Sequence, residues 1–80
     1  MWIRSQNKQL LMNVNTSEGI RINEYPDECL ICLEYCKASY DLGGYSSKEK
    51  ALLVLDMIEK VSMYPGNTLF QMPADDEVEA

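Results

Sequence analysis

The stretch CLICLEYC, residues 29–36, forms the centre of the predicted fold, because it is apolar on both faces of an extended chain. Glu34 is its only charged residue, and Ile31 and Tyr35 favour a strand over a helix. Alternation along a strand gives two sets: Cys29, Ile31, Leu33 and Tyr35 on one face, and Leu30, Cys32 and Cys36 on the other. One helix covers only one face of a sheet. We therefore expect a partner, such as a second copy of the chain, to contact Cys32 and Cys36.

The spacing of the three cysteines, C-x2-C-x3-C, also occurs in metal sites, but a strand argues against one. Residues three apart in a strand point to opposite faces, so Cys29 and Cys32 would not bind one ion together. A zinc site uses four ligands, and the chain has three cysteines and no histidine. Redox catalysis would need a thiol near a helix N-terminus or a cation, and only Lys37 is close in sequence. We predict structural thiols and no metal, with a redox or crosslinking role as the alternative.

The segments before and after this strand indicate further strands separated by turns. Residues 10–14 and 20–22 alternate apolar and polar side chains, and the turn sequences NVNTSEG and YPDE follow them. The inward side chains of these two segments are expected to be Leu10, Met12, Val14, Ile20 and Ile22. After residue 36 the chain reaches Gly43-Gly44, where the pattern predicts a break. Turns at such regular spacing are typical of an antiparallel meander.

One strong helix follows the glycines, and its apolar face predicts how it packs. Ser46 lies three residues before Glu49, which is the spacing of a capping box. One face of this helix is apolar, with Leu52 at its edge: Ala51, Val54, Leu55, Ile58 and Val61. Leu53 and Met57 lie one turn apart on the other side, where they either pack against a loop or contact a partner.

A last strand, NTLFQM at residues 67–72, ends at Pro73. The sequence therefore predicts an α+β fold: an antiparallel β-meander of about five strands, one amphipathic helix packed on one face, and a closing C-terminal strand. We expect residues 1–73 to form a single domain and residues 74–80 to form an acidic, flexible tail.

Charge and hydropathy narrow the possible functions. The net charge is −6, but four of the thirteen acidic residues lie in the tail, so the rest of the chain is nearly neutral. Nucleic acid is disfavoured as a partner, because binding to its backbone relies on clustered Lys and Arg. No apolar run is close to the roughly 20 residues that span a bilayer, and the N-terminus lacks the apolar stretch of a signal peptide. We expect a cytoplasmic protein that does not contact a membrane.

Catalytic constellations are missing from the sequence. Without histidine the commonest general base is absent, and the carboxylates before the tail occur singly or in solvated turns. We therefore predict a protein that is not an enzyme, with no catalytic residue and no cofactor.

A few residues nevertheless suit ligand binding. The helix N-terminus at Ser46 and Ser47 can hold an anion, although a Gly-Gly break before a helix is commonly only a turn. Most of the aromatic side chains are expected to be structural, but Trp2 and Tyr45 can also stack on a flat ligand. Arg4 is the favoured cationic contact for a phosphate.

Three stretches of the chain together resemble a known group of proteins: MWIRSQNKQLLMNVN, YDLGGYSSKEKALLVLDMIEK and NTLFQMP. They are similar to a family of small uncharacterised proteins of low-GC Gram-positive bacteria and their phages. In that family a WIRSQ-like hairpin precedes a Leu-Gly-x-Tyr-x-Ser-x-Glu-x-Ala-like helix start and an FQMP-like final strand. The likeness covers the two ends of the chain and excludes the cysteines. It implies a β-rich sheet with one helix and assigns no catalytic residue.

The phage-like character that this resemblance implies favours a protein that works by occupying a host component, in the cytoplasm of the host. We expect a non-enzymatic phage or mobile-element binding protein that sequesters a host defence component. Its ligand would be a small nucleotide-type signal at the subunit interface of a homo-oligomer. The expected ligand-binding residues are Trp2, Arg4, Tyr45, Ser46 and Ser47, and the expected interface residues are Leu53, Met57, Cys32 and Cys36. The alternatives are an inhibitor that binds a host protein through the helix face, and an accessory protein with another role.

Overall fold

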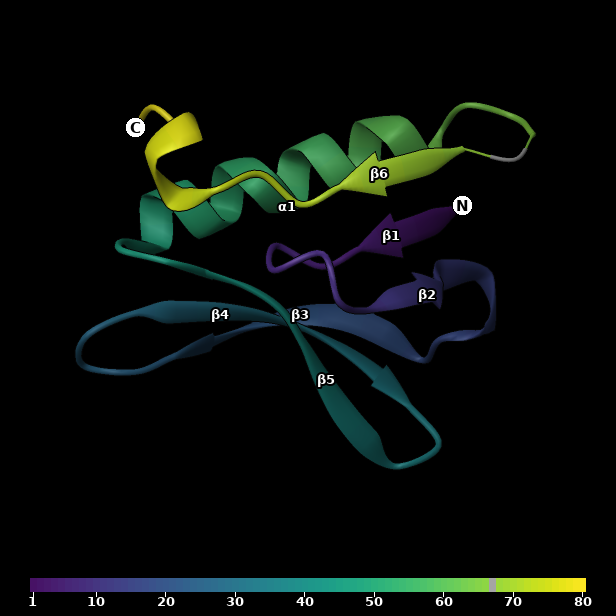
Figure 1. Ribbon diagram of the computed structural model, residues 1–80, viewed down its shortest axis with the longest axis horizontal. Helices are drawn as coiled ribbons and strands as arrows, with labels where there is room; N and C mark the ends of the chain where they lie inside the picture. The colour runs from purple at the N-terminus through teal and green to yellow at the C-terminus, as the bar shows by residue number, and fades with distance from the viewer. Residues whose placement is uncertain (67) are drawn as a thin grey trace.

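The apolar stretch at residues 29–36 provides the central strand of a sheet in the computed structural model, which describes residues 1–66 and 68–80. Strand β4 (Cys29–Tyr35) lies between β3 (Gly19–Glu24) and β5 (Ala38–Tyr45), antiparallel to both (Figure 1). We call these strands sheet B. The strand ends before Cys36, because Cys36 and Lys37 have positive φ values of 52° and 64° and make the turn to β5. Two such residues in a row are typical of a two-residue hairpin turn.

The Gly43-Gly44 pair lies inside β5, so the predicted break is wrong. Neither glycine has a positive φ, and the reason for glycine here is space. A Cβ on Gly44 would lie 2.8 Å from Oε2 of Glu28, and a Cβ on Gly43 would lie 3.1 Å from Oη of Tyr45. The ladder between β4 and β5 skips Leu42, which makes a bulge there. The strand therefore continues to Tyr45 and delivers its ring to the core.

A second sheet, sheet A, departs from the single meander that the sequence predicted. Its central strand β1 (Trp2–Arg4) pairs antiparallel with β2 (Leu11–Asn13) and parallel with β6 (Leu69–Gln71). Ile3 is opposite an apolar residue of each neighbouring strand and is fully buried. A short 3-10 helix, η1 (Val14–Thr16), then leads from sheet A into sheet B.

The predicted closing strand exists as β6, but it joins the first strand of the chain and not the meander. The N–H of Trp2 donates to the carbonyl of Thr68 at 2.8 Å, and the N–H of Met72 donates to the carbonyl of Arg4 at 3.0 Å. Asn67, the first residue of the predicted strand, lies outside the described residues. A period of two identifies a strand but not its neighbour, so this pairing of the chain ends left no local signal.

Helix α1 (Lys48–Ser62) begins one residue later than the predicted capping box. Its cap is Ser47, whose hydroxyl accepts the N–H of Lys50 at 3.2 Å, while the N–H of Ser46 donates to Asp75. The predicted core face is confirmed at Ala51, Val54 and Ile58, which are buried, and at Val61, which packs beside them, whereas Leu55 is only partly buried. No helix in the described ranges combines the length and the apolar character needed to cross a membrane.

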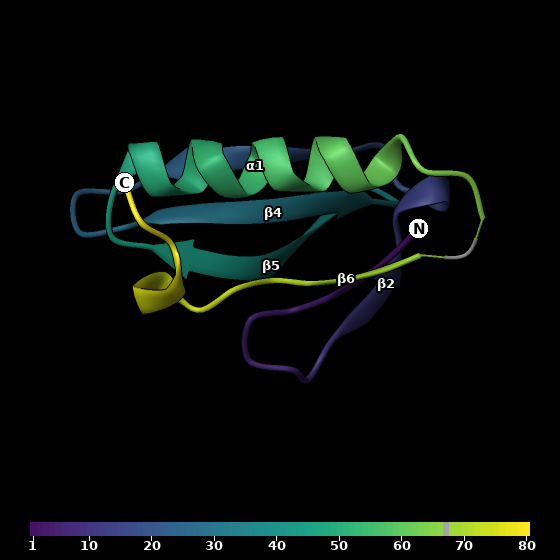
Figure 2. The ribbon, with the colours of Figure 1, turned by 90° about the horizontal axis from the view of Figure 1, so that it is seen from above.

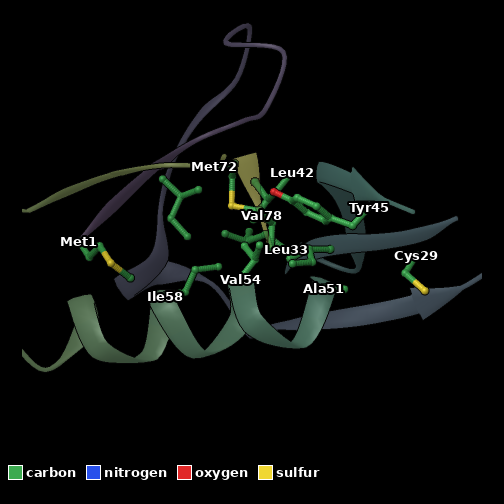
Figure 3. Packing of buried hydrophobic residues seen from close by; sticks show 12 residues of the cluster. Met1, Cys29, Leu33, Leu42, Tyr45, Ala51, Val54, Ile58, Met72 and Val78 are labelled. Carbon is green, nitrogen blue, oxygen red and sulfur yellow. The ribbon is translucent and has the colours of Figure 1, made fainter. Parts of the chain in front are cut away.

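The core lies where α1, sheet B and sheet A meet (Figures 1 and 2). In Figure 3, Ala51, Val54 and Ile58 point from the helix toward Leu33, Leu42 and Met72. The inward side chains predicted for the first strands all pack against this cluster: Leu10, Met12, Val14, Ile20 and Ile22. In the part of the chain that the structure describes, the fold is α+β with one α-helix packed on a sheet, as predicted.

Residues 74–78 are packed against the rest of the chain, whereas the sequence predicted a separate tail from residue 74. Asp75–Glu77 form the 3-10 helix η2, and the N–H of Ala74 donates to Oε1 of Glu77 at 2.8 Å. Val78 is buried within the core cluster. The one large apolar side chain of this acidic segment therefore anchors it, and residue 73 is not the end of the packed structure.

Candidate functional site

The predicted ligand-binding residues separate into two groups in the structure. Ser46 and Ser47 lie at the start of α1, and Trp2 and Arg4 lie on β1. The N-terminus and the start of α1 are at opposite ends of the molecule (Figures 1 and 2). The five residues therefore do not form one site.

Tyr45 lies in the core and not on a surface where a ligand could stack. Its side chain is 1% exposed, and its hydroxyl donates to the carbonyl of Pro73 at 2.8 Å. Burial raises the pKa of the Tyr45 phenol, and the carboxylates of Asp75 and Glu77 raise it further. The apolar ring and its polar tip are both satisfied internally, which is the usual state of a buried tyrosine.

The start of α1 already holds an anionic group of the chain itself. Oδ1 of Asp75 accepts the N–H of Ser46 at 2.8 Å, and Oδ2 lies 3.6 Å from Nζ of Lys50. The hydrogen bond from Ser46 keeps the pKa of Asp75 below its ordinary value, and Lys50 adds to the effect. The position that the sequence suggested for a phosphate is therefore occupied by the C-terminal segment.

Trp2 and Arg4, in contrast, lie together on the outer face of sheet A. Ile3 points into the core, so its two neighbours point away from it. The register places six side chains on this side: Trp2, Arg4, Leu11, Asn13, Leu69 and Gln71. We call these six residues the outer face of sheet A.

The outer face of sheet A is unusually apolar for an exposed surface. Trp2 is 41% exposed, Leu11 55% and Leu69 63%. Together with Thr68 they line a shallow depression of about 300 Å³. Side chains of this size are normally covered, and an exposed group of them is characteristic of a binding surface.

The charge on this face is positive, although the whole chain is acidic. Arg4 is the one charged residue of the face, and its Nε donates to the carbonyl of Lys8 at 3.1 Å. This bond brings the turn that carries Lys8 beside the guanidinium group. A flat apolar surface beside a cation suits a ligand that has an aromatic body and an anionic group.

The outer face of sheet B does not provide the apolar interface that the cysteines suggested. Cys32 is buried, where its thiol donates to Oδ1 of Asp41 at 3.2 Å and accepts from Nδ2 of Asn23 at 3.3 Å. Burial raises the pKa of the Cys32 thiol, and the bond to Asp41 raises it further. Cys32 is therefore covered by its own sheet and cannot contact a partner.

The other two cysteines lie elsewhere. Cys36 is exposed in the hairpin turn, so the prediction that it shares a strand face with Cys32 is wrong. Cys29 is buried at the edge of the core cluster (Figure 3). No three His, Cys, Asp or Glu side chains within the described ranges are grouped so that they could hold a metal ion.

The predicted helix interface is exposed. Leu53 and Met57 lie on the side of α1 away from the core, and Leu52 is exposed beside them. Three carboxylates and one ammonium group lie on the same side: Glu49, Asp56, Glu59 and Lys60. We call these seven residues the outer face of α1. It is apolar and net negative.

Sequence reasoning missed Gln6, which joins the two sheets. Its Nε2 donates to the carbonyls of Gly44 at 3.0 Å and Pro73 at 3.1 Å, and its Oε1 accepts the N–H of Gly44 at 3.0 Å. Gln6 therefore connects the N-terminal segment, the end of β5 and the segment after β6.

Comparison of the chain with protein-family models, with curated protein sequences and with solved structures gives no match.

Proposed function

We propose that the chain is a non-catalytic binding protein that captures a small, flat, anionic ligand of the nucleotide type on the outer face of sheet A. The observation that carries this proposal is the placement of Trp2 and Arg4 side by side on one exposed strand face. The depression bounded by Trp2, Leu11, Thr68 and Leu69 gives the ligand an apolar floor.

The chemistry of the two side chains is complementary. An indole face stacks on any base, and such stacking contributes about 1–3 kcal/mol per base. The guanidinium of Arg4 has one N–H bound to Lys8, and within residues 1–66 and 68–80 no other hydrogen bond of this group is found, so its two terminal nitrogens can donate to phosphate oxygens in pairs. The bond to Lys8 also fixes the orientation of the guanidinium, and this lowers the entropy cost of binding.

Sequestration, and not turnover, is supported by the residues available. The chain has no histidine, and a binding surface made of Trp, Leu and Arg provides no acid–base pair. The resemblance to small phage proteins favours a host defence signal as the ligand. A sequestering protein lowers the free concentration of its ligand by stoichiometric binding, so it needs affinity and abundance only.

Isothermal titration calorimetry with a panel of cyclic and linear nucleotides tests the proposal. We expect saturable heat with at least one nucleotide, and Trp2→Ala should weaken that binding roughly tenfold or more. Arg4→Ala should weaken phosphate-bearing ligands and leave the corresponding nucleosides unaffected. Tyr25→Ala, an exposed aromatic side chain that lies on neither the outer face of sheet A nor the outer face of α1, is the matched control. Absence of heat with every nucleotide, or equal binding by wild type and Trp2→Ala, would remove the proposal.

A protein partner bound through the outer face of α1 is the second candidate. The exposure of Leu52, Leu53 and Met57 on one side of the helix favours it. Pull-down from a bacterial host lysate with wild type and Leu53→Asp tests this candidate, with Trp2→Ala as the matched control. We expect the partner to be lost with Leu53→Asp alone. Recovery of the same partners by all three proteins would exclude the helix face.

A further inference from the structure

Two apolar surfaces of the molecule carry opposite charge. The outer face of sheet A combines Trp2, Leu11 and Leu69 with Arg4, next to the turn of Lys8. The outer face of α1 combines three apolar side chains with three carboxylates and one ammonium group. Within the described residues, none of the charged groups on the outer face of α1 forms an ion pair. Each surface therefore carries the charge that is complementary to that of the other surface.

These two surfaces point away from each other. The inner side of sheet A, at Ile3, and the inner side of α1, at Val54 and Ile58, belong to the same core cluster. Their outer faces consequently lie on different sides of the molecule, as Figures 1 and 2 show for the strands and the helix. One copy of the chain cannot bring its own two surfaces together, but two copies can.

We propose that the outer face of α1 of one copy docks on the outer face of sheet A of another copy. Leu53 and Met57 then cover the depression beside Trp2, and Asp56 lies within reach of Arg4. The contact is heterologous, because it joins two different surfaces. It closes into a ring if the rotation between neighbours permits, and otherwise it extends along a row of copies.

A symmetric contact of either surface with itself is disfavoured by charge. A contact between two outer faces of sheet A would join two surfaces that each carry a cation and no carboxylate, and a contact between two outer faces of α1 would join two surfaces that are each net negative. Like charges opposed in an interface are unfavourable, whereas complementary potentials fix the register of a contact. Charge complementarity therefore selects the second copy's helix over the second copy's sheet.

The neighbouring copy and the proposed ligand would use the same surface. The depression beside Trp2 is open, and in the contact Leu53 and Met57 fill it while Asp56 takes the place of a phosphate at Arg4. The carboxylates of α1 would also repel an anionic ligand, so ligand binding and association compete. This competition rests on the proposed function, whereas the association of two copies does not depend on any ligand.

Mixing two variants tests the contact without a ligand. Leu69→Asp disrupts contacts through the outer face of sheet A, and Leu53→Asp disrupts contacts through the outer face of α1. Because both positions are exposed, the fold should be unaffected. Circular dichroism and thermal melts verify this. In light scattering each variant alone should have the mass of one chain, 9.2 kDa. A 1:1 mixture should contain a species of twice that mass, because each variant keeps the surface that the other has lost.

Wild type should exceed the mass of one chain as its concentration rises. The contact is overturned if wild type remains a single chain at millimolar concentration. It is also overturned if wild type associates but the mixed variants do not, since that result requires a contact of like surfaces. Light scattering of wild type and calorimetry with monomeric Leu53→Asp test the two proposals separately. Nucleotide binding by Leu53→Asp while wild type stays a single chain supports the ligand alone, and association of wild type without nucleotide binding by Leu53→Asp supports the contact alone.

Discussion

Sheet B and sheet A each have three strands and one face against the core, but their outer faces are built differently. In sheet B, Arg21 and Glu34 form an ion pair at 2.7 Å, and Cys32 is hydrogen bonded to Asn23 and Asp41. In sheet A, the largest side chains of the outer face are apolar and exposed. The polar groups on the outer face of sheet B therefore bind one another. Sheet A, in contrast, presents a surface that is available to a ligand or a partner.

This difference is the reason that we propose ligand binding on the less regular of the two sheets. The apolar stretch at residues 29–36 belongs to sheet B, and its apolar composition is explained by packing and not by a binding function. The strands of sheet A have three residues each, and their short outward pattern is weak in the sequence. Exposed apolar side chains indicate a binding surface when packing within the molecule does not require them. Trp2 and Leu69 meet that condition.

Truncation of one leucine in each sheet gives the largest expected difference. Leu33→Ala removes a fully buried side chain of sheet B and should lower the free energy of unfolding by about 2–5 kcal/mol. Leu69→Ala removes an exposed side chain of sheet A and should change it by less than about 0.5 kcal/mol. Urea denaturation measures both. Equal destabilisation by the two variants would show that the outer face of sheet A is part of the core.

Gln6→Ala breaks the connection between the sheets. It removes three hydrogen bonds and leaves the N–H and C=O of Gly44 without their partner, so we expect a loss of about 1–3 kcal/mol. The exposed Gln9→Ala is the control and should change the free energy of unfolding by less than about 0.5 kcal/mol. If both variants melt at the same temperature, the side chain of Gln6 does not hold the sheets together.

Tyr45→Phe tests whether this tyrosine is structural. The substitution keeps the buried ring and removes the bond to Pro73, whose carbonyl still accepts from Gln6. We expect a loss of about 0.5–1.5 kcal/mol in unfolding free energy, and ligand binding equal to that of wild type. Loss of ligand binding without loss of stability would show that Tyr45 takes part in the ligand site.

Asp75 gives the smallest effect, and one that depends on pH. Its pKa is lowered from 3.8, so the contact with Ser46 stabilises the fold above that pH and is lost as the pH falls through the lower, folded-state pKa. Wild type should therefore melt above Asp75→Asn at neutral pH, and the two melting temperatures should converge below pH 3.8. A constant difference down to the most acidic pH at which the protein folds would show that the carboxylate charge is irrelevant.

The parts of the fold that could be predicted are those with a local signal. The core face of α1, at Ala51, Val54 and Ile58, follows from a period of 3.6, and β4 follows from a run of apolar and β-branched residues. The parallel pairing of β1 with β6 joins the two ends of the chain and leaves no periodic trace. The predicted meander consequently merged two sheets into one.

The candidate site was predicted only in part, for the same reason. Trp2 and Arg4 share a face because they are two residues apart in a strand, and the sequence shows this directly. Leu69 joins them only through the pairing of distant strands. The prediction of a break at Gly43-Gly44 was wrong, because glycine occurs both in turns and where two parts of the chain approach closely, and the sequence does not distinguish the two cases. Asp75 contacts Ser46 through tertiary packing, and the spacing of residues in the sequence does not predict such a contact.

Trp2 is the only tryptophan of the chain, so its fluorescence reports on the outer face of sheet A directly. The decisive measurement is its emission during titration with the nucleotide panel, corrected for absorption with a free tryptophan analogue. Stacking should quench the emission saturably, and Arg4→Ala should move the midpoint to higher nucleotide concentration. Emission that stays unchanged with a nucleotide whose binding calorimetry detects would contradict the assignment of the outer face of sheet A as the binding surface.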